Sequence, residues 1–269
     1  MKVAIIPRDP SHSPNMESND VEILAAVAKE LEKAGATVTW LKQGEFPGDG
    51  TDIVCHMSRT TAILEILERA VQLGITIINS PAGVRHCSRS IFVTLLEENG
   101  IPQPQYTVVK SAKELETLHY PAWIKRADGW SCHAGDVCYA ENLTDATVAF
   151  SNMQSRGIDA CLHCNHIKGD IIKFYGIGEN FFHYCYPDID HTKFGLEKIN
   201  GKPQKRRFDT GRLKSIATKA AKAVGVEIYG GDCIVDDDGG IHIIDINDFP
   251  SFSAVRENAA KAIAKLIMK

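Results

Sequence analysis

The sequence predicts a mixed α/β and α+β protein built from three consecutive parts. Strands alternate with helices over the first 85 residues, which indicates a parallel sheet. A helix and two short strands follow, and a strand-rich pattern fills the remainder. The chain has 269 residues and is 44% hydrophobic, enough for a sizeable core. We therefore expect an α/β unit at 1–85, a small lobe at 86–165 and a larger lobe at 166–269.

The first part begins with a short apolar run, Val3 to Ile6, that predicts a strand. A helix follows, capped by Ser18, Asn19 or Asp20 and ended by Gly35. Its apolar residues at helical spacing are Val21, Leu24, Ala25, Ala28 and Leu31. The further elements expected in this part are strands at 37–41, 52–57 and 75–78 and a helix at 60–73.

The second and third parts have fewer helices. A helix at 88–99, stopped by Gly100 and Pro102, precedes strands at 105–109 and 122–126. The elements expected after residue 160 are strands at 171–177, 181–186, 231–235 and 241–246 and helices at 210–224 and 253–268. A polar stretch at 188–208 carries six Lys or Arg residues, and it predicts either a solvated loop or a flap that gathers phosphate or substrate charge.

Composition narrows the class of partner. Lys plus Arg number 30 against 34 for Asp plus Glu, so the chain lacks the basic excess of a nucleic-acid binder. No apolar stretch approaches the roughly 18 residues of a membrane span, and the N-terminal apolar run is too short for a signal peptide. The 8 cysteines are too sparse for a secreted disulfide framework. We expect a cytoplasmic protein with reduced thiols that acts on small molecules, without a nucleic-acid or membrane partner.

The segment 231–250 contains the strongest chemical signal. A turn at 236–240 joins two strands, and Asp245 and Asn247, two residues apart, face the same side of the returning strand. Asp232 on the first strand supplies a third oxygen. Because Mg²⁺ prefers one or two carboxylates completed by water and phosphate oxygens, the trio predicts a magnesium site. An ordinary hairpin with its polar residues in water is the alternative.

This hairpin resembles the metal-binding hairpin of the ATP-grasp superfamily, through the run from Asp245 to Pro250 and an Asp thirteen residues before it. Glutathione synthetase, D-alanine:D-alanine ligase, the RimK-like ligases and the inositol trisphosphate kinases share that fold. The resemblance implies an N-terminal parallel α/β domain followed by two lobes that clasp ATP between antiparallel sheets. It also implies ATP and Mg²⁺ (or Mn²⁺) as cofactors, and homodimers are common among such relatives.

The resemblance assigns several cationic and flap residues. Lys125 stands on the strand whose lysine contacts nucleotide phosphates, and Arg89 replaces a lysine of that kind in many relatives. The segment 128–137, with His133 and Gly135, stands where relatives have a glycine-rich flap over the phosphates. Lys173 resembles a basic residue near the transferred phosphate. Arg206 or Arg207 is expected to offset charge during transfer.

The hinge that binds adenine in relatives corresponds to residues 162–170. Asn165 and Ile167 are the expected backbone contacts, and Asp170 is a candidate ribose ligand. Residues 161–166 carry two cysteines and two histidines, which raises the alternative of a zinc site. Those four candidate ligands are Cys161, His163, Cys164 and His166. On a strand, however, they would face opposite sides in pairs, so convergence would need a turn.

Three functions fit this sequence. The first is a ligase that joins a carboxylate to an amine or thiol through an acyl phosphate. The second is a kinase for a polyol or inositol phosphate, and the third is a nucleotide-binding protein without turnover. In the N-terminal part, Arg8, His12 and Arg59 are candidates for binding a substrate carboxylate or phosphate, and surface roles are equally open for each.

Overall fold

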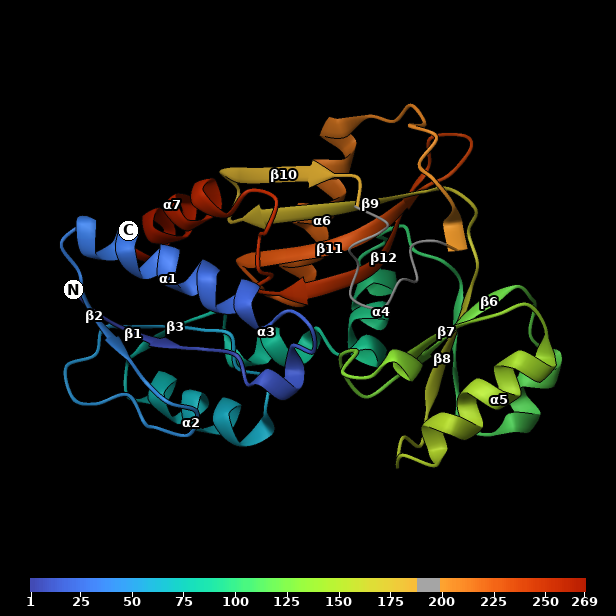
Figure 1. The fold of residues 1–269 in the computed structure, drawn as a ribbon, viewed down its shortest axis with the longest axis horizontal. Coiled ribbons are helices and arrows are strands. Elements are labelled where there is room, and N and C mark those ends of the chain that lie inside the picture. Colours follow the sequence, from blue (N-terminus) through green and yellow to red (C-terminus); the bar gives the residue numbers. More distant parts are fainter. Residues whose placement is uncertain (188–198) are drawn as a thin grey trace.

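The computed structural model describes residues 1–187 and 199–269, and it contains three four-stranded sheets (Figure 1). The first sheet is parallel, with strand order β2-β1-β3-β4. Its strands are β1 (Lys2–Ile6), β2 (Thr37–Trp40), β3 (Ile53–His56) and β4 (Thr76–Ile78). Its helices are α1 (Glu17–Lys33), α2 (Thr61–Gln72) and α3 (Pro81–His86), with a 3₁₀ turn at Pro10–His12. The predicted α/β architecture is therefore present.

Helices α1 and α2 cover opposite faces of this sheet (Figure 1). Val3 and Ile5 of β1 pack in the cluster that contains α1, whereas Ala4 and Ile6 pack in the cluster that contains α2. This alternation follows from the two-residue period of a strand. A strand buried on both faces explains why β1 reads as a continuous apolar run.

The expected start and face of α1 are partly wrong. The helix begins at Glu17 after Met16, which makes no side-chain cap, so Ser18 to Asp20 lie inside the first turns. Val21 is 57% exposed and Ala25 is also exposed. The buried stripe instead consists of Ile23, Leu24, Val27, Ala28 and Leu31. The stripe is shifted because α1 packs against both the sheet and the C-terminal helix α7 (Arg256–Ile267).

The second sheet is antiparallel, with order β5-β8-β6-β7. Its strands are β5 (Tyr106–Val109), β6 (Ala122–Arg126), β7 (Val137–Ala140) and β8 (Cys161–Asn165). Helix α5 (Leu143–Gln154) packs on it, beside 3₁₀ turns at Ala112–Thr117 and Ala134–Asp136. Neither β7 nor α5 was among the expected elements. The signal for α5 was present, since the Asn142 side chain caps it and Ala146, Ala149, Phe150 and Met153 form a helical stripe.

The third sheet, also antiparallel, has order β10-β9-β11-β12. Its strands are β9 (Asp170–Ile177), β10 (Phe181–Cys185), β11 (Ile228–Val235) and β12 (Ile241–Asp248). Helix α6 (Thr210–Val224) packs against this sheet and ends at Gly225 with φ of 86°.

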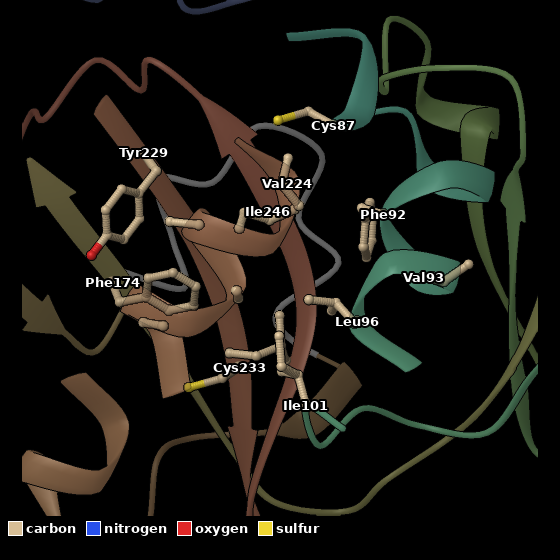
Figure 2. Close-up of a cluster of buried hydrophobic side chains, with 14 of the residues drawn as sticks. Cys87, Phe92, Val93, Leu96, Ile101, Phe174, Val224, Tyr229, Cys233 and Ile246 are labelled. Carbon is tan, nitrogen blue, oxygen red and sulfur yellow. The ribbon is translucent and has the colours of Figure 1, made fainter. Parts of the chain in front are cut away.

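Helix α4 (Arg89–Glu98) packs against this third sheet, although it stands in the stretch expected to form the small lobe. Phe92 and Leu96 lie between α4 and the strand that carries Ile246 (Figure 2). Their cluster also holds Val224 of α6 and Cys233 of β11. The apolar face of α4 thus supports the back of the strands whose other face carries the predicted metal ligands.

Part of the polar stretch at 188–208 falls outside the described residues. Asp188, Asp190, Lys193, Glu197 and Lys198 are in that part. In the described remainder, Lys202, Lys205 and Arg207 are exposed and Arg206 is half-buried.

Candidate active site

A cavity of about 660 Å³ lies between the second and third sheets and reaches the N-terminal domain. Eight of the thirteen residues expected to bind ATP or metal or to assist phosphoryl transfer line it: Arg89, Lys125, Asn165, Ile167, Lys173, Asp232, Asp245 and Asn247. They come from α4, β6, β8 and the loop after it, β9, β11 and β12. The fold therefore brings together, around one cavity, a set of residues that spans 159 positions of the sequence.

The register of β11 and β12 brings the three candidate metal ligands together. Asp232 pairs directly with Asp245, and Gly230 pairs with Asn247. Directly paired residues point to the same face of a sheet, as do residues two apart, so all three side chains share the face toward the cavity. Glycine at 231 permits this arrangement, because a Cβ there would lie 2.3 Å from the Asp245 carbonyl oxygen and 2.4 Å from the Phe174 ring.

The donor set of this trio fits a hard divalent cation. Two carboxylates and one amide oxygen form a partial shell of the kind that Mg²⁺ completes with water and phosphate oxygens. No cluster of three or more His, Cys, Asp or Glu side chains suited to a metal occurs in residues 1–187 and 199–269. Lys173 donates from Nζ to Oδ1 of Asp232 at 3.0 Å, so one candidate ligand already has a cationic neighbour.

Two further cations face the cavity from other elements. Lys125 donates from Nζ to the carbonyl oxygen of Ile244, 3.1 Å away on β12. Arg89 is 5% exposed and donates to Ser131 Oγ (2.7 Å) and to the Gly129 carbonyl (3.4 Å). Its Nε is buried and has no hydrogen-bond partner in the part of the chain that the structure describes. Arg89 is thus held by the loop that was expected to form the phosphate flap.

One hinge residue that lines the cavity, Ile167, has a backbone amide without a hydrogen-bond partner among the described residues. The amide of Asn165 donates to the Gln105 carbonyl (2.9 Å) and that of His166 to the Pro121 carbonyl (3.1 Å). Within the described residues, no hydrogen bond engages the amide of Ile167. The Asn165 side chain donates from Nδ2 to Oε1 of Gln105 at 3.2 Å, which orients its oxygen away from that partner.

The zinc alternative for the hinge is wrong, because its four side chains do not converge. Cys161 packs in the small-lobe core, whereas Cys164 lines the cavity. His163 hydrogen-bonds the carbonyl oxygen of His119 (2.9 Å), and His166 Nδ1 accepts from the Trp123 indole (3.1 Å). Burial raises the pKa of both cysteines and lowers the pKa of both histidines, as expected for thiols and neutral imidazoles packed in a lobe.

The other five of these thirteen residues, His133, Gly135, Asp170, Arg206 and Arg207, do not line the cavity. His133 is exposed and accepts from the amide of Gly135 at 3.0 Å within a turn. Arg206 donates to Asp170 at 2.6 Å and is also paired with Asp237. Burial alone would raise the pKa of Asp170, but hydrogen bonds from the Arg206 and Gln204 amides and the Arg206 guanidinium lower it. Arg207 is exposed. The roles expected for these five residues, in nucleotide binding or in phosphoryl transfer, stay predictions.

The sequence reading missed aromatic residues that line the cavity. Trp123 stands two positions before Lys125 on β6, so the two-residue period of a strand places both side chains on one face. This spacing in the sequence could have identified Trp123 as a cavity residue. Its ring packs against Tyr139 and His166, with centroids 5.3 and 6.3 Å away. Trp130 lines the cavity from the loop after β6, and no local pattern marks it.

The N-terminal candidates separate into buried and cavity-facing residues. Arg8 is buried, donates from Nε to Asp20 (2.9 Å) and from Nη2 to the Phe249 carbonyl (2.7 Å), and does not line the cavity. Arg59 lines the cavity and is held by Asp248, whose carboxylate is 1% exposed.

Comparisons with solved structures identify proteins with a similar architecture. A RimK-domain ATP-grasp protein from Sphaerobacter thermophilus matches at a TM-score of 0.72 with 16% identity, over 100% of both chains. A D-alanine–D-alanine ligase from Bacillus anthracis, solved with ATP, matches at 0.73 with 13% identity, over 100% of this chain and 96% of that one. The VanG D-Ala:D-Ser ligase from Enterococcus faecalis matches at a TM-score of 0.73 with 15% identity, over 99% of this chain and 98% of that one.

The chain therefore has the ATP-grasp fold, and the fold class expected from the sequence is confirmed. No protein-family model matches the sequence, and a comparison with curated proteins finds no match. Among the described residues, no helix has the length and hydropathy to cross a membrane.

Proposed function

We propose that this chain is an ATP-dependent ligase that joins a carboxylate to an amine or a thiol through an acyl phosphate. The observation that carries the proposal is the convergence of Asp232, Asp245 and Asn247 on a cavity that Lys125 and Lys173 also line. A fold shared with structures named as ligases supports this class of reaction. Mg²⁺ or Mn²⁺ held by the trio would supply positive charge beside the ATP phosphates.

The chain's own residues supply position and charge. Lys125, Lys173 and Arg89 stabilise negative charge on the γ-phosphoryl group as it moves from ATP to the acceptor. A carboxylate oxygen of the acceptor attacks the γ-phosphorus, and the bond to the β-phosphate oxygen breaks with its electron pair on ADP. An amine or thiol then adds to the carbonyl carbon, loses its proton to solvent and expels inorganic phosphate.

This chemistry requires no protein nucleophile. Burial raises the pKa of the cavity-lining thiols of Cys87, Cys164 and Cys185, which keeps them protonated at neutral pH.

The other residues that line the cavity suit nucleotide binding. In this proposal the adenine base lies against the hinge, where the Ile167 amide is a free donor in the described structure. We therefore place the nucleotide between the hinge and the metal-binding strands.

The test of the proposal is acid-dependent trapping of an acyl phosphate. The protein is incubated with ATP, Mg²⁺, hydroxylamine and a pool of amino acids and small carboxylates, and hydroxamates are identified by mass spectrometry. A parallel pool of polyols without acids tests a hydroxyl acceptor. Hydroxamate together with ADP and phosphate supports the ligase. A phosphorylated polyol without free phosphate would establish the kinase. ATP binding without phosphoryl transfer to a compound of either pool would favour a non-catalytic protein.

Asp245→Ala tests the site assignment within the same assay. Removing one of two candidate carboxylate ligands is expected to lower Mg²⁺-dependent turnover by roughly 100-fold or more, while ATP binding persists. Asp238→Asn on the exposed hairpin turn is the matched control and keeps wild-type turnover. Unchanged turnover in Asp245→Ala would contradict the assignment.

A further inference from the structure

Arg59 is the N-terminal cation that reaches the cavity. It follows β3, is 9% exposed and lines the same cavity as the candidate metal ligands. Its Nε donates to Oδ1 of Asp248 at 2.8 Å, and Nη2 lies 2.7 Å from the same oxygen. Its hydrogen bonds with described residues use only Nε and Nη2, so the Nη1 side of the guanidinium remains for a ligand.

Asp248 couples this guanidinium to the metal-binding strand. It directly follows Asn247 on β12, and alternation along the strand turns its side chain to the other face, toward the N-terminal domain. There it lies between Arg59 and Arg8, whose Nη1 is 3.7 Å from Oδ2. Arg8 is in turn paired with Asp20. The orientation of Arg59 is therefore fixed by buried partners.

Trp130 adds a second donor beside Arg59. The Arg59 guanidinium carbon lies 4.8 Å from the centre of the Trp130 ring, and the indole packs edge-on against His12 at 6.4 Å. The indole Nε1 is buried and has no hydrogen-bond partner in the described part of the chain. Because a buried donor without a partner is costly, an acceptor supplied by a ligand would satisfy it.

We propose that Arg59 and Trp130 bind the carboxylate of the acid that accepts the phosphoryl group. The inference rests on the proposed function, and it adds which residues bind the acid, on the side of the cavity formed by the N-terminal domain. A planar guanidinium edge matches the two oxygens of a carboxylate. Trp130 covers one face of that guanidinium, so an acid approaches in the guanidinium plane, where both of its carboxylate oxygens can accept hydrogen bonds.

Binding measurements test the subsite without turnover. Protein loaded with Mg²⁺ and a non-hydrolysable ATP analogue is titrated calorimetrically with acetate, succinate, benzoate and L-glutamate. Each acid is compared with its uncharged amide, and inorganic phosphate is the tetrahedral competitor. We expect at least one acid to bind the wild type in preference to its amide and to inorganic phosphate. Absence of such a preference in the wild type overturns the proposal.

Two variants assign that preference to the named residues. Arg59→Lys keeps the charge beside Asp248 but removes the fork, and it is expected to weaken the acid by roughly 10- to 100-fold. Trp130→Phe keeps the ring beside Arg59 and removes the N–H donor, with an expected loss of roughly 5- to 10-fold. Exposed residues supply matched controls, Arg69→Lys and Trp40→Phe, which leave acid binding unchanged.

Nucleotide affinity and hydroxamate formation separate the possible failures. The variants should bind the ATP analogue within about threefold of wild type, and equal losses for acid and nucleotide would overturn the subsite. Acid binding that depends on Arg59 without any hydroxamate would preserve the subsite and refute the ligase. Acid-dependent hydroxamate that is insensitive to both substitutions would preserve the ligase and refute the subsite.

Discussion

Replacing Asp248 by Asn perturbs the junction between the N-terminal domain and the strand that carries Asp245 and Asn247. Asp248 is 1% exposed, and the side chains of Arg8 and Arg59 beside it are 4% and 8% exposed. Asparagine has nearly the same shape, so the substitution removes the charge with little change in packing. Arg8 would keep its pair with Asp20, whereas Arg59 would lose its carboxylate partner among the described residues.

The expected cost follows from the burial of these charges. Breaking a buried ion pair by removing one partner costs about 3–5 kcal/mol, because the remaining charge stays desolvated. Asparagine still accepts a hydrogen bond from Arg59, so we expect a value near the lower end, about 3 kcal/mol of unfolding free energy. Asp238→Asn on the exposed turn serves as the control, with an expected change within about 0.5 kcal/mol.

Urea unfolding followed by both far-UV circular dichroism and tryptophan fluorescence measures this cost, and coincident curves establish that a single free energy applies. A double-mutant cycle with Arg59→Met separates the charge effect from general damage. If the cost comes from an unpaired guanidinium, removing Arg59 in the Asp248→Asn background costs at least about 1 kcal/mol less than in the wild type. Additive effects, or a single-mutant loss below about 1 kcal/mol, would refute this reasoning.

Three more outcomes are expected. Burial lowers the pKa of His56 from 6.5 to about 4. As the pH falls, the unfolded chain therefore takes up a proton on His56 before the folded chain does. The unfolding free energy should fall by about 3 kcal/mol as the pH falls from 6.5 to 4, and His56→Gln should lose that component of the profile. Gly176→Ala places a Cβ 2.1 Å from the Tyr229 ring and should cost about 1–3 kcal/mol in urea unfolding, whereas Gly48→Ala, which meets nothing within 4 Å, should be tolerated. Phe92→Ala should cost about 3–5 kcal/mol, since the ring is 2% exposed between α4 and the third sheet; a loss under 1 kcal/mol would contradict that packing.

Local periodicity allowed much of the fold and the metal trio to be predicted from sequence. Asp245 and Asn247 had to share a face because strand side chains alternate, and the turn between the strands limited where Asp232 could lie. The same rule argued against convergence of the cysteines and histidines at 161–166, which the structure then showed to be apart. Helix α6 was expected at the residues where it occurs, since its apolar stripe and Gly225 are both local signals.

Only the tertiary structure decided which charged residues meet. Arg8, His12 and Arg59 were equivalent candidates in the sequence, and their packing alone turned Arg8 into a buried partner of Asp20 and exposed Arg59 to the cavity. The side of α1 that is buried likewise depended on α7, more than 200 residues away. Periodicity determines the direction of a side chain relative to its own element, but contacts between distant elements depend on the packing of the whole core, which no local pattern encodes.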